Sequence, residues 1–138
     1  MRKIEFRGKS VKTNEWVYGY LIEGEADGKL YIGKNNMQLT EVDPETVGLF
    51  IGFDDKYNKT IYEGDIVLYK KRRYFNVVFK EGSFLFMGGD GSYYHADKFL
   101  SETIEVVDNI FDCNLISQSG KFVAELFENE RLKLIKND

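Results

Sequence analysis

The chain has 138 residues, of which 43% are hydrophobic and 15% aromatic, and its 19 basic and 23 acidic residues give a formal net charge of −4. This length suits one domain or one domain with an appendage, and the apolar content excludes global disorder. A single Cys excludes an intrachain disulfide, and the short apolar runs exclude a membrane-spanning helix of about 20 residues. The basic start is not followed by an apolar stretch, so we expect no signal peptide and a cytoplasmic protein.

Apolar residues in the first half of the chain recur with the period of two that is typical of β-strands. Residues 4–7 alternate between apolar and charged side chains and predict a short, half-buried strand. Residues 16–33 contain two aromatic and β-branched runs around a glycine-containing turn, which predicts a hairpin. Residues 47–53 are the next predicted strand, and the glycines inside it are typical of a bulge or a close backbone approach.

The second half continues this pattern of short strands and turns. Four further strands are predicted at residues 61–69, 74–79, 83–87 and 103–111. Residues 70–73 form the turn between the first two of these strands, and residues 88–92 form a loop. Several short strands at regular spacing favour a sandwich or a barrel, because closure removes exposed strand edges.

The end of the chain has a helical pattern instead. Within residues 121–135, the apolar residues recur at i, i+1, i+4 and i+5, with charged residues on the other face. These apolar residues are Phe122, Val123, Leu126 and Phe127. We expect an amphipathic helix whose apolar stripe packs either on its own β-domain or against another subunit or partner, and the sequence leaves both alternatives open.

Three blocks of the sequence resemble the YopX family, which comprises small proteins of bacteriophages and prophages. The central block is residues 42–52 followed by 61–67, in which Glu63-Gly64-Asp65 precedes a strand as it commonly does in SH3-like barrels. The flanking blocks are residues 6–21 and 105–111. The order and spacing of the three blocks make the resemblance specific over residues 1–113.

The resemblance implies a mostly β protein with a barrel-like part that acts in the cytoplasm of the bacterial host. The family has no assigned biochemical activity, so the resemblance supplies no catalytic residues. We expect a mostly β fold of the α+β class, with an N-terminal β-hairpin region, an SH3-like or related β-barrel core at about 47–113, and a C-terminal helix. Residues 1–113 are then the YopX-like domain and residues 114–138 a helical appendage, which extends beyond the usual end of family members.

No residues have the arrangement of a catalytic centre. Cys113 and His95 are the sole Cys and His, and a thiol beside an imidazole can act as a nucleophile and base. Neither lies in a nucleophile motif, and a lone Cys beside a strand is usually a small core residue. The glycines of residues 88–92 lack the Lys and Ser/Thr pair of a phosphate-binding loop. We therefore expect no enzyme and no cofactor.

Two groups of side chains are weak candidates for binding a divalent ion. They are His95 with Asp97 and Asp90, and Asp54 with Asp55 and Asn58. Zinc usually takes more His or Cys ligands, and the second group lacks the spacing of a calcium loop. Polar surface loops explain both groups better, so we expect no metal site.

The strongest charge feature is a basic turn beside aromatic residues. Its members are Lys70, Lys71, Arg72 and Arg73, with Tyr74 following. Such a turn can follow phosphates and stack on bases, whereas the structural alternative is a solvated hairpin tip whose charges deter edge pairing.

The favoured function is a non-enzymatic, phage-encoded accessory protein that acts through protein–protein contacts. We expect it to form a homo-oligomer and to contact a host or phage protein, with no membrane partner. The alternative is a small nucleic-acid-binding protein that uses the basic turn at residues 70–73.

Overall fold

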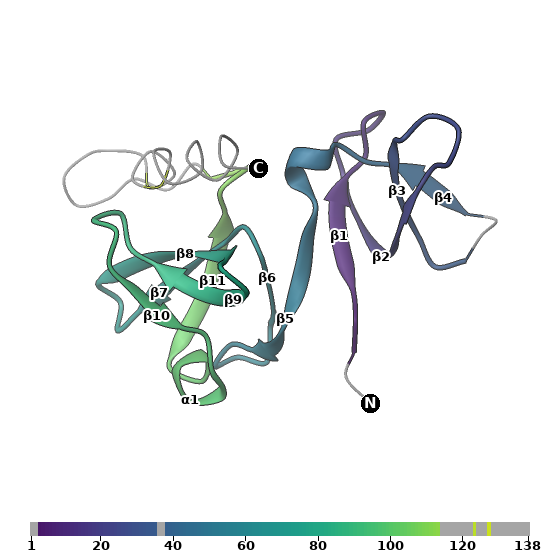
Figure 1. Cartoon of the computed structure of the whole chain (residues 1–138). Coiled ribbons are helices and arrows are strands. Elements are labelled where there is room, and N and C mark those ends of the chain that lie inside the picture. The colour runs from purple at the N-terminus through teal and green to yellow at the C-terminus, as the bar shows by residue number, and fades with distance from the viewer. Residues whose placement is uncertain (1–2, 36–37, 114–122, 124–126, 128–138) are drawn as a thin grey trace. The chain divides into compact units, whose positions relative to one another are not determined.

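The computed structural model describes residues 3–35, 38–113, 123 and 127. The chain divides into two compact units, the first ending at Gly52 and the second beginning at Phe53 (Figure 1). Both units consist mainly of antiparallel strands, which confirms the predicted mostly β fold. The predicted boundary after residue 113 lies where the continuous description ends, so it stays a prediction.

The first unit is an antiparallel sheet with strand order β4-β3-β2-β1-β5. Its strands are β1 (Phe6–Lys9), β2 (Trp16–Glu23), β3 (Leu30–Gly33), β4 (Leu39–Glu41) and β5 (Gly48–Asp54). β2 and β3 form the predicted hairpin, with Leu21 opposite Ile32. A 3-10 turn, η1 (Pro44–Thr46), follows β4, and the Asp43 carboxylate caps it by accepting a hydrogen bond of 3.1 Å from the Glu45 N–H.

Gly8 on β1 lies against two buried core residues of the first unit, Ile32 and Val42. Ile32 and Val42 are each 1% exposed. A Cβ atom at position 8 would lie 3.1 Å from both Ile32 Cδ1 and Val42 Cβ, closer than ordinary van der Waals contact. The absence of a side chain at this position therefore sets how closely β1 approaches the core.

Replacing Gly8 with valine is expected to destabilise the first unit by about 1–3 kcal/mol, the usual cost of overpacking a filled core. Urea denaturation followed by the fluorescence of Trp16, the single tryptophan, would measure the change. Glu23→Val is the control, because Glu23 is exposed on β2. Equal midpoints for the two variants would contradict the expected crowding at Gly8.

The second unit contains a five-stranded sheet with order β10-β9-β8-β7-β11. Its strands are β7 (Asp65–Tyr69), β8 (Arg73–Lys80), β9 (Ser83–Met87), β10 (Tyr93–His95) and β11 (Ile104–Asn109). The short strand β6 (Thr60–Tyr62) precedes them and is the neighbour of β5. The helix α1 (Lys98–Ser101) lies at the end of the sheet, where the chain passes from β10 to β11 (Figure 1).

The predicted barrel closure is wrong for the described part of the chain. β10 and β11 are the two outer strands and do not pair with each other. The physical reason is that β10 ends after three residues, where the chain turns into α1. The predicted strand at 61–69 is two strands, because Gly64, with a φ of 89°, turns the chain between β6 and β7.

Both faces of the second sheet are buried. Alternation along the paired strands places one set of side chains on one face, namely Val67, Phe75, Val77, Phe86, Ile104 and Val106. The opposite face carries Ile66, Val78, Leu85 and Met87. The strands of this unit therefore carry apolar residues in both alternating positions.

Two residues of the predicted tail stripe lie in this core. Val123 is 0% and Phe127 1% exposed, and both belong to one cluster with Ile66. Four partly buried residues pack against the cluster, namely Tyr74, Val107, Ile110 and Cys113. This packing favours the alternative in which the stripe covers its own domain. Phe122, Leu126 and the rest of the predicted helix lie outside the described residues.

Candidate functional site

The basic turn is the tip of the hairpin formed by β7 and β8. The Arg72 N–H donates a hydrogen bond of 3.1 Å to the Tyr69 carbonyl, and the central residues Lys70 and Lys71 have φ angles of 50° and 59°. Positive φ at both central positions is the signature of a type I′ turn, which Asn-Gly usually occupies. For a residue with a side chain, this backbone conformation costs roughly 1–2 kcal/mol. The two lysines are therefore placed in a locally unfavourable conformation.

The five residues predicted to contact nucleic acid differ in their surroundings. Lys70, Lys71 and Arg72 are exposed, whereas Arg73 and Tyr74 are half-buried. The Lys70 ammonium lies 5.2 Å from the centroid of the Tyr69 ring. Tyr74 packs against the core cluster of the second unit. Only the first three residues are thus well placed to meet a ligand from solvent.

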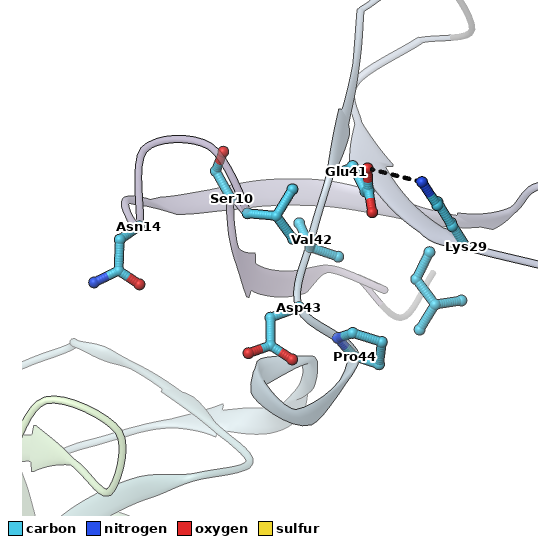
Figure 2. A pocket seen from close by; sticks show the side chains of 9 residues that line it. Ser10, Asn14, Lys29, Glu41, Val42, Asp43 and Pro44 are labelled. Atoms are coloured by element: carbon cyan, nitrogen blue, oxygen red, sulfur yellow. Dashed lines mark ion pairs between the residues drawn. The ribbon is translucent and has the colours of Figure 1, made fainter.

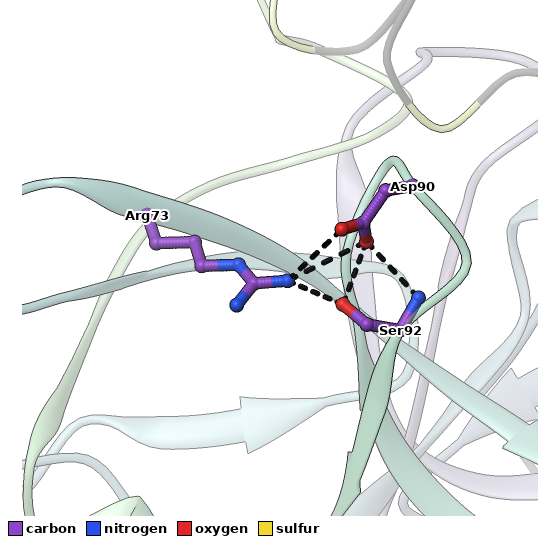
Figure 3. Close-up of polar contacts among 3 residues, drawn as sticks. All are labelled: Arg73, Asp90 and Ser92. Carbon is purple, nitrogen blue, oxygen red and sulfur yellow. Dashed lines mark hydrogen bonds and ion pairs between the residues drawn. The ribbon is translucent and has the colours of Figure 1, made fainter.

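Arg73 is engaged with the loop between β9 and β10. Its Nη2 atom lies 3.4 Å from both carboxylate oxygens of Asp90 and donates to the hydroxyl of Ser92 (Figure 3). Its guanidinium also lies 4.9 Å from the centroid of the Phe75 ring. The positive charge of Arg73 is therefore matched within the chain, and the arginine connects β8 to the loop of residues 88–92.

The same contacts set the protonation of Asp90. Hydrogen bonds from the Ser92 hydroxyl and backbone N–H, together with the weaker influence of Arg73, hold the pKa of Asp90 below its ordinary value of 3.8. Because the folded pKa is lowered, these contacts stabilise the loop above pH 3.8 and are lost as the pH falls through the folded pKa.

A carboxyl NMR titration is expected to place the midpoint of Asp90 below 3.8. Ser92→Ala should move this midpoint upward, since it removes the hydroxyl that favours the carboxylate. A midpoint that does not change in the variant would contradict the assigned cause.

β10 is an outer strand with exposed side chains. Tyr93 is 56% and Tyr94 49% exposed, and His95 is also exposed. The Ala96 N–H donates a hydrogen bond of 3.0 Å to the Phe84 carbonyl, and the Gly88 N–H donates one of 2.8 Å to the Ser92 carbonyl. Hydrogen-bonded pairs alternate along an antiparallel ladder, so Tyr94 bonds toward β9 as well. The N–H and C=O groups of Tyr93 and His95 therefore point away from the sheet.

The opposite edge of this sheet differs, because residues 55–56 cover it. The Lys56 N–H donates a hydrogen bond of 3.0 Å to the Ile104 carbonyl, and the Val106 N–H donates one of 2.8 Å to Asp55 Oδ2. In the first unit, the Val11 N–H similarly covers the outer strand β4, because it donates a hydrogen bond of 3.1 Å to the Glu41 carbonyl. β4 and β11 thus each have a covering contact from the described residues, whereas β10 has none from them.

A cavity of about 440 Å³ lies beside β10. Tyr93 pairs with Met87 and His95 with Leu85, so these four side chains share one face of the sheet. Lys80, Glu81, Ser83 and Gly91 complete the described lining. The cavity therefore has an apolar floor of two buried residues and a polar rim that contains an ammonium, an imidazole, two hydroxyls and a carboxylate.

A second hollow of about 320 Å³ lies in the first unit (Figure 2). Its polar groups are used locally, since Lys29 Nζ lies 3.8 Å from Glu41 and the Asp43 carboxylate caps η1. The Ser10 hydroxyl accepts hydrogen bonds of 3.2 and 3.3 Å from the backbone N–H groups of Lys12 and Thr13. These contacts stabilise the local structure of the first unit.

Cys113 and His95, whose pairing the sequence disfavoured, are not brought together. His95 lies on the outer strand β10, whereas Cys113 follows β11 at the other edge of the sheet and packs against the apolar cluster. Asp97 caps α1 by accepting a hydrogen bond of 2.7 Å from the Leu100 N–H. Within the residues that the structure describes, no three His, Cys, Asp or Glu side chains are grouped to hold a metal ion.

The sequence pattern missed the β10 strand and recognised only its histidine as a candidate. A strand of three residues is too short to show a period of two. The sequence feature that indicates this strand is the aromatic run Tyr93-Tyr94-His95, which lies between the turn residue Gly91 and the helix cap Asp97.

Two antiparallel sheets, one of them with an exposed aromatic edge, define a small β protein of two units. A comparison with known families matches residues 5–116 to the family described as YopX protein. The chain therefore belongs to the YopX family, which confirms the resemblance seen in its three sequence blocks. No curated protein matches the chain. None of the helices in the described ranges is long and apolar enough to cross a membrane.

Proposed function

We propose that this protein is a non-enzymatic, phage-encoded accessory protein of the bacterial cytoplasm that acts through protein contacts at the outer edge of β10. The observation that supports the proposal is the outward-facing backbone of Tyr93 and His95 on an exposed strand. An uncovered edge is a template for another strand, and main-chain hydrogen bonds supply the affinity of such strand addition. Self-association into a homo-oligomer is a separate part of the proposal that does not depend on β10, and light scattering tests it.

An SH3-like architecture for the second unit also remains our proposal. The strand order β10-β9-β8-β7-β11, with a short helix before the last strand, supports it. Folds of this kind host many unrelated functions, so the proposed function depends on the edge itself and not on the fold.

Purification from phage-infected cells tests the role of the edge. Tagged wild-type protein is expected to retain a protein partner after nuclease treatment, and His95→Pro should reduce its recovery. Proline removes an N–H that faces away from the sheet, a position where edge strands tolerate it. Phe99→Ala is the control, because Phe99 is an aromatic residue of α1 that is 83% exposed. Equal recovery with all three proteins, at unchanged melting temperatures, would contradict the proposal.

A second candidate function, nucleic-acid binding, is favoured by the two lysines with positive φ at the hairpin tip. Residues in sparsely populated backbone regions cluster at functional sites. Three exposed cations at residues 70–72 predict a slope of log K against log salt of about −2.7 on duplex DNA.

The double variant Lys70→Asn with Lys71→Gly is expected to stabilise the protein by about 1–2 kcal/mol while it weakens DNA binding, because it relieves the turn and removes two charges. Glu81→Asn is the matched control, since Glu81 has a φ of 52° in the turn between β8 and β9 and lies outside the basic turn. It should stabilise the fold without weakening binding. Absence of DNA binding by the wild type at low salt would exclude this second function.

A further inference from the structure

The cavity beside β10 lies where the side chains of an added strand would point. Tyr93 and His95 present their backbone groups outward, and their side chains lie on the same face as the cavity floor. A residue directly opposite either of them on an incoming strand would project to this same face, because paired residues share a face of the sheet. Strand addition at β10 would therefore bring alternate side chains of the ligand to the mouth of the cavity.

The chemistry of the rim favours a ligand side chain with negative charge. The Lys80 ammonium, the His95 imidazole and the hydroxyls of Ser83 and Tyr93 can all donate hydrogen bonds. Glu81 supplies the only carboxylate among the described lining residues, and it is exposed at the turn. On this basis we infer that the cavity selects an acidic side chain from an extended segment of a partner protein, which rests on the function proposed above.

A second copy of this chain is a poorer occupant of the same cavity. If two β10 strands paired with each other, each cavity would receive Tyr93 or His95 from the other copy. Neither side chain is acidic, so neither would complement Lys80. The cavity thus favours a different protein segment with Asp or Glu at the alternating positions.

A peptide titration followed by NMR tests the inference on the full-length, ¹⁵N-labelled chain. The probes are three blocked pentapeptides, Thr-Val-Glu-Val-Thr and its counterparts with Gln or Lys at the centre. The Glu peptide is expected to shift the Tyr93 and His95 amide signals and to bind about two- to fivefold more tightly than the Gln peptide, the ratio that one partly exposed ion pair supplies. The Lys peptide should bind most weakly.

Two variants separate selectivity from strand addition. Lys80→Gln should bring the Glu and Gln peptides to equal affinity, whereas Lys98→Gln, on α1 and outside the described lining, should not. His95→Pro should abolish the shifts with every peptide. Equal binding of all three peptides to the wild type would contradict the preference for an acidic side chain but not strand addition at β10. If no peptide shifts the Tyr93 and His95 signals, both the acidic preference and strand addition are contradicted. Shifts that appear on concentrating the protein without peptide identify a second copy as the occupant and overturn the inference.

Discussion

Replacing Phe127 with alanine is expected to lower the free energy of unfolding of the second unit by about 3–5 kcal/mol, the usual cost of truncating a buried aromatic side chain. Phe127 is 1% exposed and lies in one cluster with Ile66 and Val123. Since Ile66 belongs to β7, this cluster connects the tail residue to an inner strand of the sheet. Losing the ring would leave a cavity against that strand.

Urea denaturation followed by far-ultraviolet circular dichroism measures this loss, and light scattering on the same samples measures the mass. Phe99→Ala is the control, because Phe99 is 83% exposed and its truncation should change stability little. A Phe127→Ala variant with unchanged stability and a reduced mass would show that the ring contacts another subunit. That result would contradict its packing on its own domain.

Replacing Asp55 with alanine is expected to lower the free energy of unfolding by about 3 kcal/mol, because the buried Val106 amide and two partly buried amides lose a charged acceptor. The Asp55 side chain accepts hydrogen bonds of 2.8 Å from the backbone N–H groups of Tyr57, Lys59 and Val106. Asp55 itself is 4% exposed. Its carboxylate thus closes the loop after β5 and ties this loop to β11.

Asp54→Ala is the matched control, since the neighbouring Asp54 is exposed. Asp55→Asn should have an intermediate effect, because the amide retains one acceptor oxygen. Faster hydrogen exchange of the Val106 amide in Asp55→Ala would identify the lost contact. Equal stability of the Asp54 and Asp55 variants would contradict the structural role of the Asp55 carboxylate.

Long strands with turn residues on both sides were the most predictable part of the fold. The predicted hairpin and the strands predicted at 47–53, 74–79 and 83–87 agree with the bounds of β2, β3, β5, β8 and β9 within a few residues. β4, β10 and α1 contain only three or four residues each, so periodicity cannot reveal them. Barrel closure depends on pairing between distant strands, which a local pattern does not specify.

The candidate site was less predictable because its contacts join residues that are far apart in the chain. The four residues of the basic turn are all cationic in the sequence, yet Arg73 alone forms contacts with Asp90 and Ser92 on the loop between β9 and β10. Asp55 resembles a member of a surface cluster in the sequence, because its partner Val106 lies 51 residues later in the chain. The covered edge at β11 and the uncovered edge at β10 are likewise visible only in three dimensions.

Amide hydrogen exchange of β10, measured by NMR on the protein at low concentration, most directly tests whether the outer edge of this strand is free to bind a partner. The Tyr93 and His95 amides should exchange quickly, whereas the Tyr94 and Ala96 amides, which bond to β9, should be protected. Binding of a partner segment should then slow exchange at Tyr93 and His95. Equal protection of all four amides in the monomeric, ligand-free protein would mean that the edge is already covered and would contradict the proposed binding surface.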